Sequence, residues 1–421
     1  MAAATVMSNI QTKNKLVQYT TEINREYVRE NLFSPYMGTD ASSIIRIRNE
    51  AKKGGDQINF PMVGSLYGPG TPVALGSPSY AYGVDTLTGN EEKIDNYGMR
   101  VWIDWARNAV ATNDAEEQKD SADIFGEAKP LLSDWGKSLQ RDEIILAMAN
   151  FPSESQPTNL GGLTSLNGRV NGTPFTGTAV NTWTADNADR VLFGNARSNN
   201  TGALVASLAN VDVTSDTFVP ASVSLLKYMA KTAVPKIRPY TTRDGREYYV
   251  CFAGSANFAQ LKTAMNTVGT AGTVSGINLY ARPREENGYG DAPNNPLFQD
   301  GDLMYDGVII REIPEIENFV GTTATPGVWL MHNVGTTTSR VAPVFLCGQQ
   351  AVMFAWGKMA TPTFRDQTDY QFVRGVGVKM CYGVAKTFRI PRRNFDTVDT
   401  TYTKMVQTGM VTGFFSATQP T

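Results

Sequence analysis

The stretch of sequence that decides the fold is NDAEEQKDSADIFGEAKPLLSDWGKSLQRDEIILAMANF, residues 113–151. Its apolar side chains recur at steps of three, four and seven, which is the spacing of one face of an α-helix. The pattern predicts a single long helix of about 35 residues, a length at which any bend needs a local cause. The stripe consists of Phe125, Ala128, Leu132, Trp135, Leu139, Leu146 and Ala149.

The ends of this helix carry their own signals. Asn113 or Asp114 can cap the first turn, and a Phe-Pro pair at 151–152 can end the last turn. Pro130 lies inside the stripe, where its ring removes a backbone hydrogen bond. We therefore expect a kink or a break near Ala128.

The segment before the helix predicts a hairpin. Gln57–Val63 and Tyr97–Asp104 alternate apolar and polar side chains, as strands with one buried face do. The chain between them is rich in Gly, Pro, Ser and Tyr, which favour turns and loops. We expect two paired strands that bracket a long, protruding excursion.

The remainder mixes helices and strands, so the expected fold class is α+β. Residues 1–53 are interpreted as an extended or helical arm rather than a core element, and residues 153–216 as an irregular insertion dominated by Gly, Asn, Thr and Ser. The run at 351–356 is too short for periodicity to assign. Helices are expected at 219–233 and 256–265, and strands at 247–253, 304–313, 327–332, 341–347, 371–379 and 383–390.

Length and charge limit the possible functions. A chain of 421 residues exceeds the size at which one hydrophobic core stops growing, so two or more lobes are expected. A net charge of -2 gives no broad basic field for nucleic acid, although Arg389, Arg392 and Arg393 leave a local contact open. No apolar run approaches the length of a membrane-spanning helix, and the first residues do not resemble a secretory signal.

The residues that usually carry catalysis are scarce. His332 is the single histidine, and Cys251, Cys347 and Cys381 lie in apolar runs that suggest buried thiols in a reducing compartment. Phosphate-loop, dinucleotide and nucleophile-elbow motifs are absent, so we expect no enzyme activity, no cofactor and no metal. The 40 Asp and Glu residues still allow paired carboxylates, so a carbohydrate-active enzyme stays open as an alternative.

Several phrases in this chain resemble those of tailed-bacteriophage major capsid proteins. They recur in the order typical of the family represented by the coat protein of phage N-four. The phrases are Gly55-Asp-Gln-Ile-Asn-Phe60, Leu87-Thr-Gly-Asn-Glu-Glu92, Val101-Trp-Ile-Asp-Trp-Ala-Arg-Asn-Ala-Val110, Trp135-Gly-Lys-Ser-Leu139, Glu247-Tyr-Tyr-Val-Cys-Phe252, Asp369-Tyr-Gln-Phe372 and Gly383-Val-Ala-Lys386.

The resemblance implies the tailed-phage capsid fold of the Hong Kong type, with an arm, an extended loop, a spine helix, and peripheral and axial domains. The implied divisions are an N-terminal arm at 1–53, an extended loop hairpin at 54–108, a peripheral domain with the spine helix at 109–152, an irregular insertion at 153–217, an axial domain at 218–345, and a peripheral return with the C-terminus at 346–421.

The resemblance also implies a function spread over interfaces. The chain would form hexamers and pentamers of an icosahedral virion shell around double-stranded DNA, which it would hold without sequence specificity. Scaffolding, portal and decoration proteins would be partners, with assembly in the host bacterial cytoplasm and no membrane. In the extended loop, Phe60, Met62, Leu66 and Tyr67 would become buried only against a neighbouring subunit. Another virion component, such as a tail tube or decoration protein, is the nearest alternative.

Overall fold

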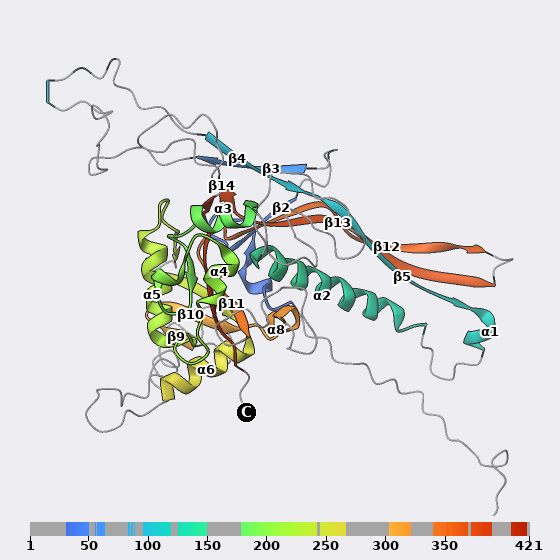
Figure 1. Ribbon diagram of the computed structural model, residues 1–421. Helices are drawn as coiled ribbons and strands as arrows, with labels where there is room; N and C mark the ends of the chain where they lie inside the picture. Colours follow the sequence, from blue (N-terminus) through green and yellow to red (C-terminus); the bar gives the residue numbers. More distant parts are fainter. Residues whose placement is uncertain are drawn as a thin grey trace, which may run out of the picture. The chain divides into compact units, whose positions relative to one another are not determined.

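The computed structural model describes most of the central and C-terminal chain, as Figure 1 shows by colour. The described residues are 31–49, 55, 57–63, 83–84, 86, 88, 96–118, 125–149, 178–241, 245–266, 303–320, 340–368, 372–389 and 406–418. They divide into two compact units: a smaller unit with 106–138 and 360–380, and a larger unit with the rest.

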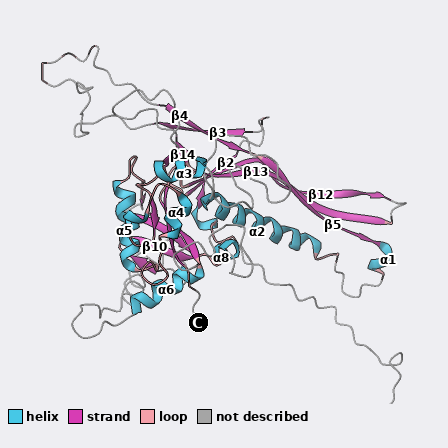
Figure 2. Cartoon of the chain, in the orientation of Figure 1, coloured by secondary structure: helices cyan, strands magenta, loops and turns pink. Residues whose placement is uncertain are grey.

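The larger unit is built on a seven-stranded sheet (Figures 1 and 2). Its pairs β6/β16 and β8/β10 are parallel, and its other pairs are antiparallel. In order the strands are β6 (Val191–Phe193), β16 (Met410–Ser416), β11 (Val341–Cys347), β8 (Glu247–Ala253), β10 (Val308–Glu312) and β9 (Leu303–Tyr305), with β7 (Tyr240–Thr241) also paired to β8.

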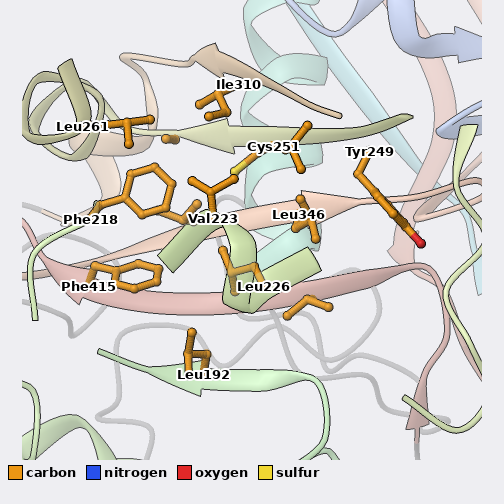
Figure 3. Close-up of a cluster of buried hydrophobic side chains, with 14 of the residues drawn as sticks. Leu192, Phe218, Val223, Leu226, Tyr249, Cys251, Leu261, Ile310, Leu346 and Phe415 are labelled. Atoms are coloured by element: carbon orange, nitrogen blue, oxygen red, sulfur yellow. The ribbon is translucent and has the colours of Figure 1, made fainter. Parts of the chain in front are cut away.

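One face of this sheet forms the main hydrophobic core under helices α5 (Pro220–Thr232) and α6 (Ser255–Asn266). Leu226 of α5 and Phe415 of β16 are both fully buried in it, and Figure 3 shows their side chains in the same cluster. Pro220 occupies the first turn of α5, where a missing N–H costs nothing.

The opposite face is covered by the start of the described chain. Phe33 and Tyr36 meet Phe252 of β8 edge-on, with ring centroids 5.1 and 5.2 Å apart. Arg311 of β10 donates a hydrogen bond of 3.2 Å to the Tyr36 hydroxyl. Since both faces are covered, strands β8 and β11 are apolar along nearly their whole length rather than alternating.

The expectation that residues 1–53 form an arm outside the core is therefore wrong for residues 31–49. This segment contains the 3-10 helix η2 (Ser34–Tyr36) and strands β1 (Met37–Gly38) and β2 (Ile45–Asn49). Its aromatic and aliphatic side chains Phe33, Ile44 and Ile45 are buried. Charged residues lie between these apolar positions, so the sequence did not indicate a core segment here. Residues 1–30 lie outside the described part.

A second sheet of five strands has the order β1, β2, β12, β13, β5. Strand β2 runs parallel to β1 and to the first residues of β12. The two units divide β12 after Met359 and β13 after Met380. The longer strands are β12 (Val352–Thr368), β13 (Val373–Lys386) and β5 (Asp104–Asn113).

The expected hairpin is confirmed. Strands β3 (Gln57–Val63) and β4 (Asn96–Trp102) pair antiparallel, with Gln57 opposite Trp102 and Val63 opposite Asn96. A second short antiparallel pair joins β14 (Phe388–Arg389) to β15 (Val406–Gln407).

The expected break near Ala128 is also confirmed, but the single helix of residues 113–151 is wrong. The segment forms α1 (Asp114–Glu117) and a separate α2 (Ala128–Ala149). Pro130 falls in the first turn of α2, where its ring is tolerated, so the proline marks the start of a helix rather than a kink within one.

The expectation of irregular structure in the insertion is wrong for its described part. Residues 178–209 form ordered elements, and β6 pairs with β16 in the main sheet. Polar residues here make turns between short elements, which composition alone could not distinguish from loop. The elements are α3 (Thr178–Asp186), β6, η3 (Arg197–Asn199) and α4 (Leu204–Ala209).

Most of the remaining expected elements are confirmed, including α5, α6, β8 and β11, while 327–332 lies outside the described residues. The strand at 304–313 is instead a hairpin of β9 and β10, followed by α8 (Ile316–Val320). Asp306 and Gly307 both have positive φ, 50° and 70°, as a tight hairpin turn requires. The unassigned run at 351–356 is strand, as the start of β12.

The core predicts a large cost for removing one aromatic ring. We expect Phe415→Ala to lower the free energy of unfolding by about 3–5 kcal/mol, because it leaves a cavity between β16 and α5. Urea unfolding followed by circular dichroism measures this change. Tyr228→Ala on the same helix is the control, since that ring is 55% exposed; equal losses in both variants would contradict the assigned core.

Candidate assembly surface

The residues expected to await a neighbouring subunit are in part already buried. Phe60 is 1% exposed within its own chain and packs with Met99 and Val101 of β4, and Met62 is partly buried against the same cluster. Burial of Phe60 only on assembly is therefore wrong, because β13 and β14 also supply cover through Ala385 and Phe388. Leu66 and Tyr67 lie outside the described residues.

The other face of the same hairpin remains open. Asn59, Pro61 and Val63 alternate with the buried positions of β3 and are exposed, and Val63 keeps 68% of its surface. The guanidinium of Arg48 lies 5.8 Å from the Phe60 ring centre and donates 2.7 Å to the Asn59 carbonyl oxygen. The hairpin is thus fixed from one side and available from the other.

The smaller unit has a thin core. Ala128 and Leu132 of α2 pack on Val376 of β13, with Phe125 and Val378 beside them. This cluster is far smaller than the main core, so much of the sheet formed by β5, β12 and β13 in this unit has no cover from the residues that the structure describes.

Large apolar side chains consequently remain on the surface of the smaller unit. Phe364 is 70% exposed, Leu131 45%, Phe372 42% and Val110 38%. They come from α2, from β5 and β12, and from the turn just before β13. Exposed apolar groups gathered in one small unit are typical of a surface that another chain covers.

One edge of this sheet is open for hydrogen bonding. The N–H of Asp114, just after β5, donates a hydrogen bond of 3.1 Å to the carbonyl oxygen of Phe372. Since backbone groups alternate along a strand, the N–H groups of even-numbered residues in β5 face β13, and those of odd-numbered residues point away from it. The N–H of Ala109 accordingly donates to the side chain of Asn108 instead, at 2.9 Å. Among the described strands none pairs with this outer edge of β5.

The opposite edge is blocked by a proline. Thr363 of β12 faces Gly377 of β13, with its hydroxyl within 2.9 Å of the position that a Cβ on the glycine would take. The backbone groups of Thr363 and of the other odd-numbered residues in this part of β12 form hydrogen bonds with β13. The backbone nitrogen of Pro362 therefore points to the outer edge, and proline has no N–H to donate there. The sheet therefore presents one open edge, β5, and one closed edge, β12.

Metal-binding side chains do not gather in the described part of the chain. No cluster of three or more His, Cys, Asp and Glu side chains that could hold a metal occurs there. The cysteines are free and buried, as expected, and burial raises the pKa of each thiol above its ordinary value. Across the same residues, no helix has the length and apolar character needed to cross a bilayer. His332 lies outside the described residues.

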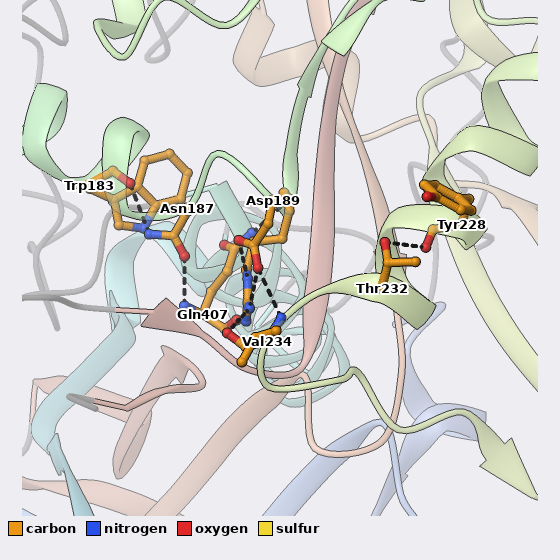
Figure 4. A network of polar contacts seen from close by, with 8 residues as sticks. Trp183, Asn187, Asp189, Tyr228, Thr232, Val234 and Gln407 are labelled. Carbon is orange, nitrogen blue, oxygen red and sulfur yellow. Dashed lines mark hydrogen bonds and ion pairs between the residues drawn. The ribbon is translucent and has the colours of Figure 1, made fainter. Parts of the chain in front are cut away.

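A buried polar network ties distant parts of the larger unit together (Figure 4). Arg190 has no exposed surface and forms a double hydrogen bond to Asp189, at 2.8 and 3.0 Å. Its other donors reach the carbonyl oxygens of Val234, at 2.6 Å, and of Gln407. One side chain thus connects the start of β6, the end of α5 and β15.

The same network extends to helix α3. Asn187 donates 2.9 Å to the Trp183 carbonyl and accepts 2.9 Å from the Gln407 N–H. Burial alone would raise the pKa of Asp189, but the Arg190 guanidinium lowers it below the usual value. The network is a structural joint rather than a reactive site.

Comparison with known proteins agrees with this architecture. The model of the phage capsid protein family matches residues 5–412. The chain is 25% identical over 358 residues to the major capsid protein of Pseudomonas phage KPP25, covering 83% of each. The capsid of cyanophage Pam1 aligns with a TM-score of 0.69 and 28% identity over 97% of this chain and 98% of that one. The capsid of Ralstonia phage GP4 aligns with a TM-score of 0.66 and 19% identity over the full length of both.

The fold is therefore that of the tailed-phage capsid proteins, the Hong Kong type, in a mixed α+β form. The chain belongs to the phage capsid protein family. The expected fold class is confirmed, and the narrower resemblance to the phage N-four coat protein stays a prediction.

Sequence reasoning missed the surface of the smaller unit. Strand β5 follows β4 after a single residue and consists mostly of Ala, Asn and Thr, so it gives no clear alternation. Its signal was the small side chains at Ala109 and Ala111, which face Gly377 and Gly375. Phe364 carried no signal, because its exposure depends on how far α2 reaches over the sheet.

Arg190 gives a prediction for the joint. Arg190→Met should lower the free energy of unfolding by about 2–6 kcal/mol, because two buried carbonyl groups lose their donor at about 1–3 kcal/mol each. Urea unfolding of the purified protein measures the loss. Arg197→Met is the control, since this arginine is exposed. A loss for Arg190→Met below about 1 kcal/mol, the least expected for a single unpaired carbonyl group, would show that the joint is dispensable.

Proposed function

We propose that the chain is the major capsid protein of a tailed phage and self-assembles into the hexamers and pentamers of an icosahedral shell around double-stranded DNA. Membership of the capsid family and the described surfaces support this proposal. The single observation that carries it is the sheet of the smaller unit, which keeps large apolar side chains and one strand edge uncovered.

An uncovered sheet of this kind needs a partner. Phe364, Phe372 and Val110 are exposed in the single chain, so a neighbouring subunit could remove them from water, and each buried Å² of apolar surface contributes about 25 cal/mol. An open edge is also a template for a further strand, which proteins otherwise block with proline or charge. A chain that assembles in many copies has such partners in its own neighbours.

The open edge of β5 gives this contact a direction. A strand from a neighbouring subunit can add to the outward N–H groups at Arg107 and Ala111, whereas Pro362 prevents addition at β12. The same asymmetry would keep subunits from joining edge to edge at both sides, which favours a closed assembly over an open fibre.

The divisions of the chain follow from the same proposal. Hairpin β3–β4 would be the extended loop, its free face with Val63 lying on a neighbour, and α2 would be the spine helix. Residues 1–53 would include the N-terminal arm, and residues 218–345, which supply β7, β8, β9, β10 and β11 of the seven-stranded sheet, the axial domain. The net charge of -2 suits a shell that holds packaged DNA without tight wall binding.

Further parts of the proposal rest on the family. Scaffolding, portal and decoration proteins would be the partners, the virion shell the final location, and the host bacterial cytoplasm the place of assembly. No enzyme activity is proposed, since function would lie in the contacts between copies.

Electron microscopy with light scattering on the purified full chain, with and without scaffolding proteins, tests the assignment. Closed shells, or rings of six and five subunits, are the expected outcome. A carbohydrate-active enzyme would stay a monomer or small oligomer under both conditions, and that result would overturn the proposal.

The exposed aromatic residue of β12 gives a specific prediction. Phe364→Asp should reduce shell formation at least tenfold, because a charge would have to be buried at each contact. The melting temperature should change little, since the ring is 70% exposed in the single chain. Tyr228→Asp is the matched control, because Tyr228 on α5 is also exposed, at 55%, and this variant should assemble normally. Assembly of Phe364→Asp at the wild-type level would remove this surface from the interface.

The strand edge gives a second prediction. Ala111→Pro removes an outward N–H of β5 without touching its bonds to β13, so the subunit should fold and the critical concentration for assembly should rise severalfold. Light scattering across a concentration series measures it. Ala360→Pro adds a proline to the outward side of β12 and serves as the control, because that edge is already blocked. Equal critical concentrations for both variants would argue against strand addition at β5.

A further inference from the structure

A lysine lies buried at the end of β13, without a counter-charge among the residues that the structure describes. Lys386 is 3% exposed, and its ammonium nitrogen has no hydrogen-bond partner within the described chain. It lies 5.2 Å from the ring centre of Trp183 on helix α3, a residue that is itself 4% exposed. A lysine is almost never buried in this way unless it is paired, so its environment disfavours a charge.

Within the described part of the chain, no carboxylate acts on this lysine. Helix α3 contributes the Trp183 ring, and β11 contributes Cys347, the titratable group of the described residues that acts on Lys386. Burial raises the pKa of the Cys347 thiol well above neutrality, so Cys347 stays uncharged over the same range. The ion pair of Arg190 with Asp189 is closed on itself and on backbone carbonyls.

Burial sets the protonation state of this side chain. It lowers the pKa of Lys386 from 10.5 to about 7, against a smaller opposing effect of Cys347. When the site opens, the amine regains its ordinary affinity for a proton. Between pH 7 and 10.5 the open form therefore binds one proton more than the closed form, and closing becomes more favourable as pH rises.

We propose that Lys386 is a proton-sensitive latch, which holds helix α3 against the end of β13 when the amine is neutral and releases the helix when the amine is protonated. The neutral amine packs beneath the Trp183 ring as an apolar side chain would. A protonated amine keeps its contact with the face of the Trp183 ring, but it loses its hydration and has no hydrogen-bond partner among the described residues. Since the ring alone replaces only part of that hydration, the lowest-cost response is to reach water by displacing α3.

The placement of the latch limits what it moves. Strand β13 ends at Lys386 and passes directly into β14, which is held by β15. Beyond α3, Asn187 and Arg190 fix the chain to Gln407. Displacement is therefore confined to α3 and its contact with α4, while the main sheet stays closed. Helix α3 is a local element of the subunit whose order depends on pH near neutrality.

Hydrogen exchange followed by mass spectrometry on the full chain tests this latch. The protection factor of the α3 amides, corrected for the intrinsic pH dependence of exchange, should rise about tenfold per pH unit between pH 7.5 and 9, since one proton is released on closing. Amides of β8 and β11 should show no such slope, because these strands are not released.

Two variants separate the latch from a general effect of pH. Lys386→Met should abolish the slope and give α3 higher protection than wild type at pH 7.5. Lys358→Met is the matched control, because Lys358 also lies near a tryptophan ring, 5.8 Å from Trp105, but is exposed; it should keep the wild-type slope. A flat wild-type profile, or an unchanged slope in Lys386→Met, would overturn the proposal, and the wild-type profile decides even if the variant fails to fold.

Discussion

The hydrogen-bond ladder of β11 is the constraint on which the larger unit depends. All seven residues of this strand are buried, so every backbone group in it needs a partner away from water. Those partners are β8 on one side and β16 on the other, and β16 lies near the end of the chain. The core under α5 and α6 cannot close until β16 is in place, because Phe415 and Val411 fill its middle. The sheet is therefore completed only by a strand that lies far along the chain from β11.

Polar groups inside this unit specify how its parts join. Arg190 satisfies two carbonyl oxygens and one carboxylate from three separate segments, an arrangement that apolar packing alone would not fix. Lys386 is the opposite case, a polar group that burial leaves unpaired. The first stabilises a single arrangement, whereas the second makes a neighbouring helix sensitive to pH. Both residues lie close to α3. Arg190 fixes the chain just after the helix, whereas Lys386 contacts Trp183 within it and makes its packing depend on pH.

The smaller unit follows another principle. Its core is limited to a few residues around Val376, and large apolar side chains such as Phe364 remain in water. A monomeric protein would gain by covering them, but a shell subunit needs them for its neighbours. The contrast between the open edge of β5 and the edge of β12 closed by Pro362 adds a direction to that need. Incomplete burial in one unit and a complete sheet in the other fit a chain that folds first and assembles afterwards.

Local patterns in the sequence determined much of the fold. The alternation in β3 and β4, the helix signals of α5 and α6 and the break at Pro130 are decided by neighbouring residues, so they could be predicted. Family phrases such as Val101-Trp-Ile-Asp-Trp gave the fold class and the kind of function. Only the tertiary structure placed Phe60 inside its own chain, brought β6 and β16 together, and left Phe364 exposed. Those outcomes depend on which distant segment covers a side chain, and a one-dimensional pattern records that a residue is apolar but not what will lie against it.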